Sequence, residues 1–134
     1  MVVCDRSAIH GDYAAGDGDF TAALTTDGVL DIAIRGVWTV QQVDRFFSAI
    51  MPLYHQSRAQ FGTVRALILV QTVQSPTVAL HVRDRTLALK MVGDRNAVVV
   101  ASFLSKLQIT RLATTENFGV FTDAGIAREW LLAP

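Results

Sequence analysis

The chain of 134 residues has little of what marks several large classes of protein. Its single cysteine, Cys4, excludes an intramolecular disulfide and leaves a reducing compartment as the expectation. Twelve basic and twelve acidic side chains give a formal net charge of zero, whereas nucleic-acid binders and polybasic membrane binders normally carry a basic excess. No apolar run approaches the roughly 18–20 residues of a membrane span. We therefore expect a cytoplasmic protein with no nucleic-acid partner and no integral membrane segment.

Residue sets that bind metals or perform catalysis are also missing from the sequence. The three histidines, His10, His55 and His81, lie on separate segments, and no pair has the i, i+4 spacing of a helical metal site. No Gly-x-Ser-x-Gly motif of the serine hydrolases is present. We expect no metal, no cofactor and no catalytic residues.

What the sequence does contain is a domain-sized hydrophobic pattern that begins with a hairpin. Half of the residues are hydrophobic, enough for one packed domain. Residues 1–19 hold three glycines and no periodicity, which predicts a flexible leader ahead of a domain over residues 20–134. Residues 20–26 and 29–35 each alternate apolar and polar side chains, and the Asp27-Gly28 pair between them favours a tight turn.

Helical and strand patterns then alternate to the end of the chain. Thr39 and Gln42 fit the capping box of a helix that runs to Phe61, ends at Gly62 and is bent by Pro52. The elements expected after it are a strand over 64–70, a helix over 76–91, a strand over 97–101, a helix over 103–113, a strand over 119–121 and a terminal helix from residue 122. The prediction is a single α/β domain, with a mixed and mostly parallel sheet of about five strands, an N-terminal β-hairpin and four helices.

The predicted topology gathers several hydroxyl side chains at one edge of the sheet. Parallel strands with right-handed crossovers place their C-terminal ends at a common rim. Four residues there can each cap a helix, and together they form a candidate rim for anion binding or phosphorylation: Ser75, Ser102, Thr39 and Thr122. The simpler interpretation is that each hydroxyl satisfies only its own helix.

Two more residues at the rim are candidate ligand or partner contacts. Trp38 and Gln71 follow predicted strands, and a tryptophan at such a rim suits a contact with a ligand or protein. Burial of Trp38 against the first helix is the alternative. The charged clusters at residues 83–85 and 94–95 are expected to be solvated charges and turn formers.

The element order resembles that of the SpoIIAA-like domains of the STAS/SEC14-like family over residues 20–132. The segments that carry the resemblance are residues 36–38, 51–54, 94–100, 104–108, 120–123 and 127–131. The resemblance implies a small mixed sheet packed by helices, in bacterial proteins mostly without an assigned activity. Some relatives are phosphorylation-switched antagonists of anti-sigma factors, and others resemble lipid-carrier folds. The antagonists carry an Asp-Ser pair where the third strand meets its helix, whereas Gln71 and Ser75 occupy that region here, which argues against the phosphoswitch role.

Three functional hypotheses follow. The preferred one is a non-enzymatic domain that binds a protein partner or a small ligand, with a homodimer left open. The second is a carrier of a hydrophobic small molecule or lipid, held between the sheet and the first two helices near Pro52. The third is an enzyme that uses the hydroxyl-lined rim. A continuous apolar cavity would favour the carrier, an exposed apolar patch the partner-binding domain, and converging polar groups in a cleft the enzyme.

Overall fold

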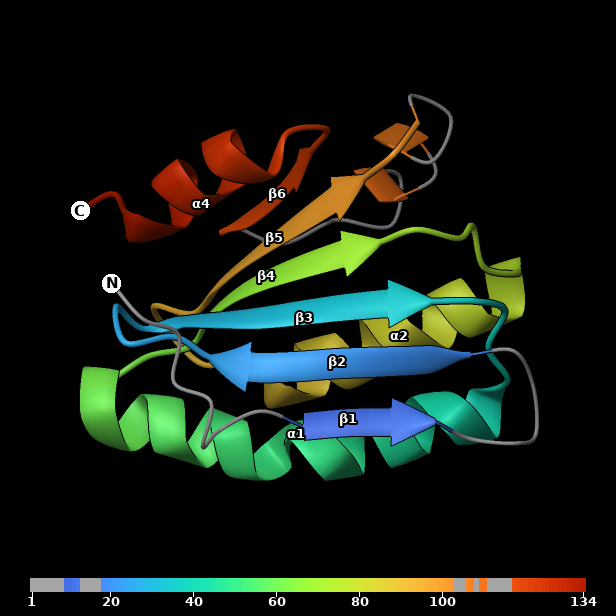
Figure 1. Ribbon diagram of the computed structural model, residues 1–134, viewed down its shortest axis with the longest axis horizontal. Coiled ribbons are helices and arrows are strands. Elements are labelled where there is room, and N and C mark those ends of the chain that lie inside the picture. Colours follow the sequence, from blue (N-terminus) through green and yellow to red (C-terminus); the bar gives the residue numbers. More distant parts are fainter. Residues whose placement is uncertain (1–8, 13–17, 103–105, 108, 111–116) are drawn as a thin grey trace.

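The molecule is built on one six-stranded sheet whose strands follow chain order from β1 to β6 (Figure 1). The computed structural model describes residues 9–12, 18–102, 106–107, 109–110 and 117–134. The strands are β1 (Ile9–Asp12), β2 (Asp19–Leu24), β3 (Val29–Arg35), β4 (Arg65–Val70), β5 (Arg95–Val100) and β6 (Phe118–Phe121). The first two pairings are antiparallel and those from β3 to β6 are parallel. The predicted α/β class, hairpin and mostly parallel sheet are confirmed.

The sheet has one strand more than expected. Strand β1 lies within residues 1–19, where no strand was predicted, and pairs with the outer edge of β2 from Ile9–Ala22 to Asp12–Asp19. Its sequence holds one apolar residue, so backbone pairing rather than an alternating side-chain pattern defines it. Residues 1–8 and 13–17 of the predicted leader, Cys4 included, lie outside the described residues.

Helix α1 (Val40–Phe61) begins and ends where its sequence signals place it. Thr39 Oγ1 accepts a hydrogen bond from the Gln42 amide at 3.1 Å, and Gln42 Oε1 accepts one from the Thr39 amide at 2.8 Å. Gly62 ends the helix with a φ of 77°, a left-handed conformation that glycine adopts without strain. Pro52 lies inside the helix and is exposed.

The other helices differ from the prediction at their ends. Helix α2 (Pro76–Leu89) starts at the predicted Ser75 cap but stops two residues early, because a turn from Met91 to Asp94 replaces its last residues. Helix α4 (Ala124–Leu132) is capped by Asp123 and not by Thr122: the Asp123 carboxylate accepts the Ile126 amide at 2.9 Å. Aspartate is at least as good a cap as threonine, which explains the shift by one residue. Most of the helix predicted over residues 103–113 lies outside the described residues. The four residues of this range that are described, 106–107 and 109–110, are helical.

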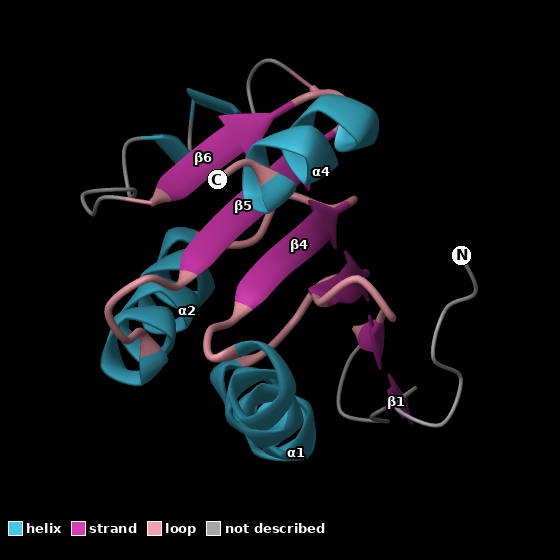
Figure 2. Cartoon of the chain, turned by 90° about the vertical axis from the view of Figure 1, so that its left-hand side faces the viewer, coloured by secondary structure: helices cyan, strands magenta, loops and turns pink. Residues whose placement is uncertain are grey.

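The helices cover opposite faces of the sheet. Figure 2 shows α1 and α2 on one side and α4 on the other. The larger core cluster lies under α1 and contains an aromatic group, in which the Phe46 ring meets the rings of Phe20 and Trp38 edge-on at 4.9 and 5.4 Å between centroids. The smaller cluster lies under α4 and includes Val29, Leu67, Ala97, Val99, Ala127 and Leu131. Each face therefore has its own apolar packing.

Asp94 is buried, which corrects the expectation of a solvated charge. It is 3% exposed, and its carboxylate accepts two hydrogen bonds from the Arg58 guanidinium, both at 2.9 Å. It also accepts the backbone amides of Val64 at 3.0 Å and Met91 at 2.9 Å. Burial raises the pKa of Asp94, but the hydrogen bonds from Arg58 and the two amides outweigh it and hold this pKa below its ordinary value. Asp94 thus joins the end of α1, the start of β4 and the turn after α2.

Candidate ligand cavity

Helix α2 makes more contacts with the neighbouring helix α1 than with the strands of the sheet. Asp44 Oδ1 on α1 lies 2.7 Å from His81 Nε2 and accepts a hydrogen bond from Arg85 at 2.8 Å. The guanidinium of Arg85 also lies 5.3 Å from the centroid of the Phe47 ring. The hydrogen bond with His81, with the nearby Arg85 charge, lowers the pKa of Asp44. These contacts hold α2 beside α1, and few contacts join α2 to the strands.

A cavity of about 130 Å³ lies between α2 and the sheet. Its volume is close to that of an engineered apolar cavity of about 150 Å³ that stays dry and binds benzene. It is therefore large enough for one ring or a short alkyl chain. Most of its wall is apolar and comes from strands, helices and loops alike: Ile34, Trp38, Val43, Phe46, Ile68, Val70, Val73, Val78, Ala79, Val82, Leu87, Val98, Ile109 and Phe118.

The polar part of the wall is small and has one sign of charge. It consists of Gln74, Arg83, Thr86, Lys90 and Asn96. Three of the five, Arg83, Thr86 and Lys90, come from α2 and its C-terminal cap. Among the described residues the wall contains no aspartate or glutamate.

Gln74 closes the end of the cavity near the C-terminal ends of β3 and β4. Its Oε1 accepts the Trp38 amide at 2.9 Å, and its Nε2 donates to the Gly36 carbonyl at 2.8 Å. Because Gly36 and Trp38 follow β3 whereas Gln74 follows β4, one side chain joins the two loops. Trp38 is 5% exposed, and its indole N–H donates to the Arg35 carbonyl at 2.8 Å. The tryptophan is therefore a fixed part of the wall.

The predicted rim residues lie at the expected edge of the sheet but do not build this cavity. The hydroxyls of Thr39 and Ser75 accept hydrogen bonds from Gln42 and Val78 of their own helices. The other three, Gln71, Ser102 and Thr122, are exposed. Trp38 is the one predicted site residue that lies in the cavity wall within the described part of the chain.

The carrier hypothesis placed a ligand between the sheet and the first two helices, but sequence reasoning named no cavity residue on α2. Val78 and Val82 face it, while Leu80, on the other side of the same helix, is 41% exposed. A helix with apolar residues on several sides does not show which side faces the core. That absence of a single apolar stripe was the available signal that α2 does not pack closely on the sheet.

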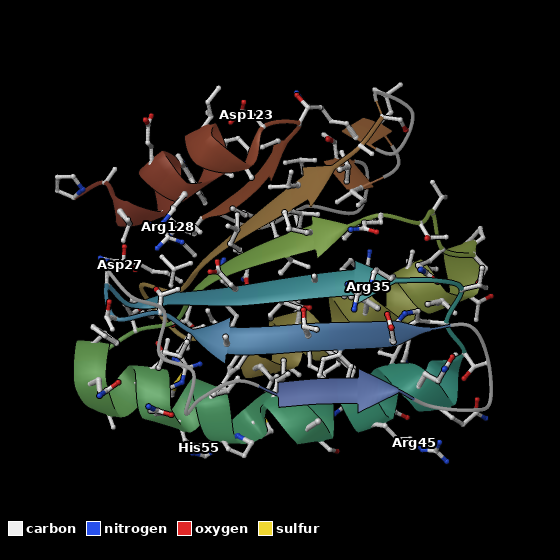
Figure 3. All side chains as sticks on the ribbon, in the orientation of Figure 1. Asp27, Arg35, Arg45, His55, Asp123 and Arg128 are labelled. Carbon is white, nitrogen blue, oxygen red and sulfur yellow. The ribbon has the colours of Figure 1, made fainter. Side chains whose placement is uncertain are left out.

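Polar residues outside the cavity form ion pairs on the sheet face that carries α4. Arg128 donates to both carboxylate oxygens of Asp27, at 2.7 and 2.8 Å, and the two side chains point toward one another in Figure 3. Arg128 also lies 3.5 Å from Asp31. Burial raises the pKa of Asp31 above its ordinary value. His55 and Arg45 lie on α1 and point away from the sheet in the same view. No group of three or more potential metal ligands occurs among the described residues.

Comparisons with protein-family models, curated proteins and solved structures found no match to this chain. The resemblance to the SpoIIAA-like domains therefore stays a prediction. Within the described residues, none of the helices combines the length and the apolar character that crossing a bilayer requires.

Proposed function

We propose that this chain is a non-enzymatic domain that binds a small apolar molecule in the cavity between α2 and the sheet. The observation that carries the proposal is the cavity itself, about 130 Å³ in volume and lined mostly by apolar side chains. Transfer of apolar surface from water into such a site is favourable by about 25 cal/mol per Å². The guest would gain this free energy by contact with the apolar wall of the cavity.

The composition of the wall favours ligand binding over catalysis. Enzymatic sites pair a nucleophile or a general base with a group that orients it. In the described part of the wall, the charged groups are Arg83 and Lys90, and no carboxylate or histidine accompanies them. The rim hydroxyls of Thr39 and Ser75 are engaged as helix caps. Catalysis at the rim consequently has less support than binding in the cavity.

Two alanine-to-leucine substitutions on α2 provide the test. Ala79 lies in the cavity wall, whereas Ala88 is exposed on the same helix. A leucine at position 79 fills part of the cavity, so Ala79→Leu should abolish binding of hexan-1-ol, measured by titration calorimetry. Ala88→Leu, the matched control, should leave the affinity unchanged. For a guest of this size we expect a dissociation constant of about 0.1–1 mM in the wild-type protein.

The stability of the same variants gives a second readout. Filling a cavity commonly stabilises a protein by about 0.5–2 kcal/mol, so Ala79→Leu should also unfold at a higher urea concentration. If the wild-type protein binds neither hexan-1-ol nor benzene, or if Ala79→Leu binds them as well as Ala88→Leu does, the proposal is wrong.

A further inference from the structure

Among the described residues, the charged side chains of the cavity wall are cationic. Arg83 and Lys90 are both half-buried in it, and the described wall residues include no carboxylate. An apolar cavity alone would need no cation. We infer that the ligand is an apolar carboxylic acid, with its hydrocarbon part in the cavity and its carboxylate held by Arg83 and Lys90. This inference rests on the proposed function and specifies the chemical class of the ligand.

Arg83 and Thr86 lie on α2, and Lys90 is its C-terminal cap residue. Their positions are i, i+3 and i+7, and residues at these spacings lie above one another on a helix. The rise of about 1.5 Å per residue separates Arg83 from Lys90 by roughly 10 Å along the axis, a distance that two long side chains can span toward Thr86 between them. The Thr86 hydroxyl donates its proton to the Val82 carbonyl at 2.8 Å and so offers no hydrogen bond to a carboxylate. A ligand carboxylate between the ends of these side chains would accept its hydrogen bonds from Arg83 and Lys90.

The existing partner of Arg83 is easily replaced. Its guanidinium lies 3.1 Å from the Asp84 carboxylate, whose side chain is 65% exposed. Ion pairs this exposed contribute little, because water and salt screen them. A ligand carboxylate at the half-buried mouth of the cavity is less screened and makes a charge-assisted hydrogen bond. The same cations repel a ligand that carries an amine, so the site discriminates by charge.

Three six-carbon probes with the same alkyl chain separate the head-group effect from the cavity effect. Titration calorimetry at pH 7 compares hexanoate, hexan-1-ol and hexylammonium in 50 mM salt. The wild-type protein should bind hexanoate about fivefold more tightly than hexan-1-ol, and hexylammonium more weakly than either. The hexanoate preference should decrease in 500 mM salt, whereas hexan-1-ol binding should not weaken.

The variants locate the effect on α2. Arg83→Gln combined with Lys90→Gln should abolish the preference for hexanoate and leave hexan-1-ol affinity within about twofold. Asp84→Asn is the matched control, because it breaks the same surface ion pair but keeps the Arg83 charge. That variant should retain the preference or increase it. Circular dichroism and urea midpoints of each variant establish that the helix is still folded.

The outcomes separate this inference from the proposed function. Binding of hexan-1-ol without any preference for hexanoate overturns the carboxylate site and leaves the apolar cavity function intact. A preference that survives in the double variant also overturns it. Failure of all three probes to bind overturns the proposed function itself. Loss of the preference in the double variant and its retention in Asp84→Asn support the inference.

Discussion

Replacing Asp94 by asparagine tests how the end of α2 is held on the rest of the molecule. Arg58 bonds to the Asp94 carboxylate through both terminal nitrogens, and it also donates to the Leu89 carbonyl at 3.0 Å. The pair thus connects the last turn of α2 to the end of α1. An asparagine side chain would keep the shape of the aspartate but lose its charge. Its NH2 group would replace one carboxylate oxygen, and it cannot accept the hydrogen bonds that this oxygen now receives.

The expected cost follows from burial. Removing one partner of a fully buried ion pair costs about 3–5 kcal/mol. The Arg58 side chain is 25% exposed, so water can partly hydrate it once its partner is neutral. We therefore expect Asp94→Asn to lower the free energy of unfolding by about 3 kcal/mol at pH 7, measured by urea titration. The control is Asp84→Asn, which should change stability by no more than about 0.5 kcal/mol because that carboxylate is exposed.

The stability difference between wild type and Asp94→Asn should depend on pH in one direction. Hydrogen bonds from Arg58 and two backbone amides hold the pKa of Asp94 below its ordinary value, despite the opposing effect of burial. The contribution of the carboxylate is therefore complete above the pKa of the unfolded chain, about 3.9. It is lost as the pH falls through the lower pKa of the folded protein. The difference in the free energy of unfolding between wild type and Asp94→Asn should be constant from pH 7 to 5 and should decrease toward pH 3. This reasoning would be refuted if the free energy of unfolding of Asp94→Asn lay within about 1 kcal/mol of the wild-type value at pH 7, or if the difference did not decrease in acid.

Substitutions at three further positions test individual contacts by urea unfolding. A Cβ at Gly18 would lie 2.5 Å from the Trp38 ring, so Gly18→Ala should destabilise the fold by about 1–3 kcal/mol; an unchanged midpoint would show that the ring can move. Ser75→Ala should cost about 1 kcal/mol through loss of the cap, whereas Ser75→Asp should be nearly neutral, and equal losses in both would contradict a capping role. Pro52 is exposed and removes a helical hydrogen bond, so Pro52→Ala should stabilise the protein by about 1–3 kcal/mol, while destabilisation would mean that the core depends on the bend.

The fold could be predicted where the sequence pattern reflects local chemistry. The hairpin at Asp27-Gly28, the capping box of Thr39 and Gln42 and the Ser75 cap each depend on residues within four positions of one another. Strand β1 could not be predicted, because its only partner in the described sheet is the backbone of β2, across a segment that carries no pattern. The shift of the last cap from Thr122 to Asp123 lies within the usual uncertainty of helix ends.

The candidate site depends on contacts between segments that are distant in the sequence, and no sequence pattern indicates these contacts. Asp94 looked like an ordinary turn residue because its partner, Arg58, lies 36 positions earlier. Gln74 carries no sequence signal of its own, yet it bonds to the loop that contains Trp38. Both α1 and α2 contribute residues to the cavity wall and are joined through Asp44, and neither helix alone indicates this arrangement.

The order of the strands in the sheet has a consequence for how the chain folds during synthesis. Each strand of the described sheet after β1 pairs with the one before it in the chain, so each new strand meets a partner that has already left the ribosome. Pairing of successive elements also keeps the closed loops short, which lowers the entropy lost before the first contacts form. Helix α4 comes last, and its Arg128 bonds to Asp27, 101 positions earlier. Completion of the final helix is thereby coupled to the first hairpin.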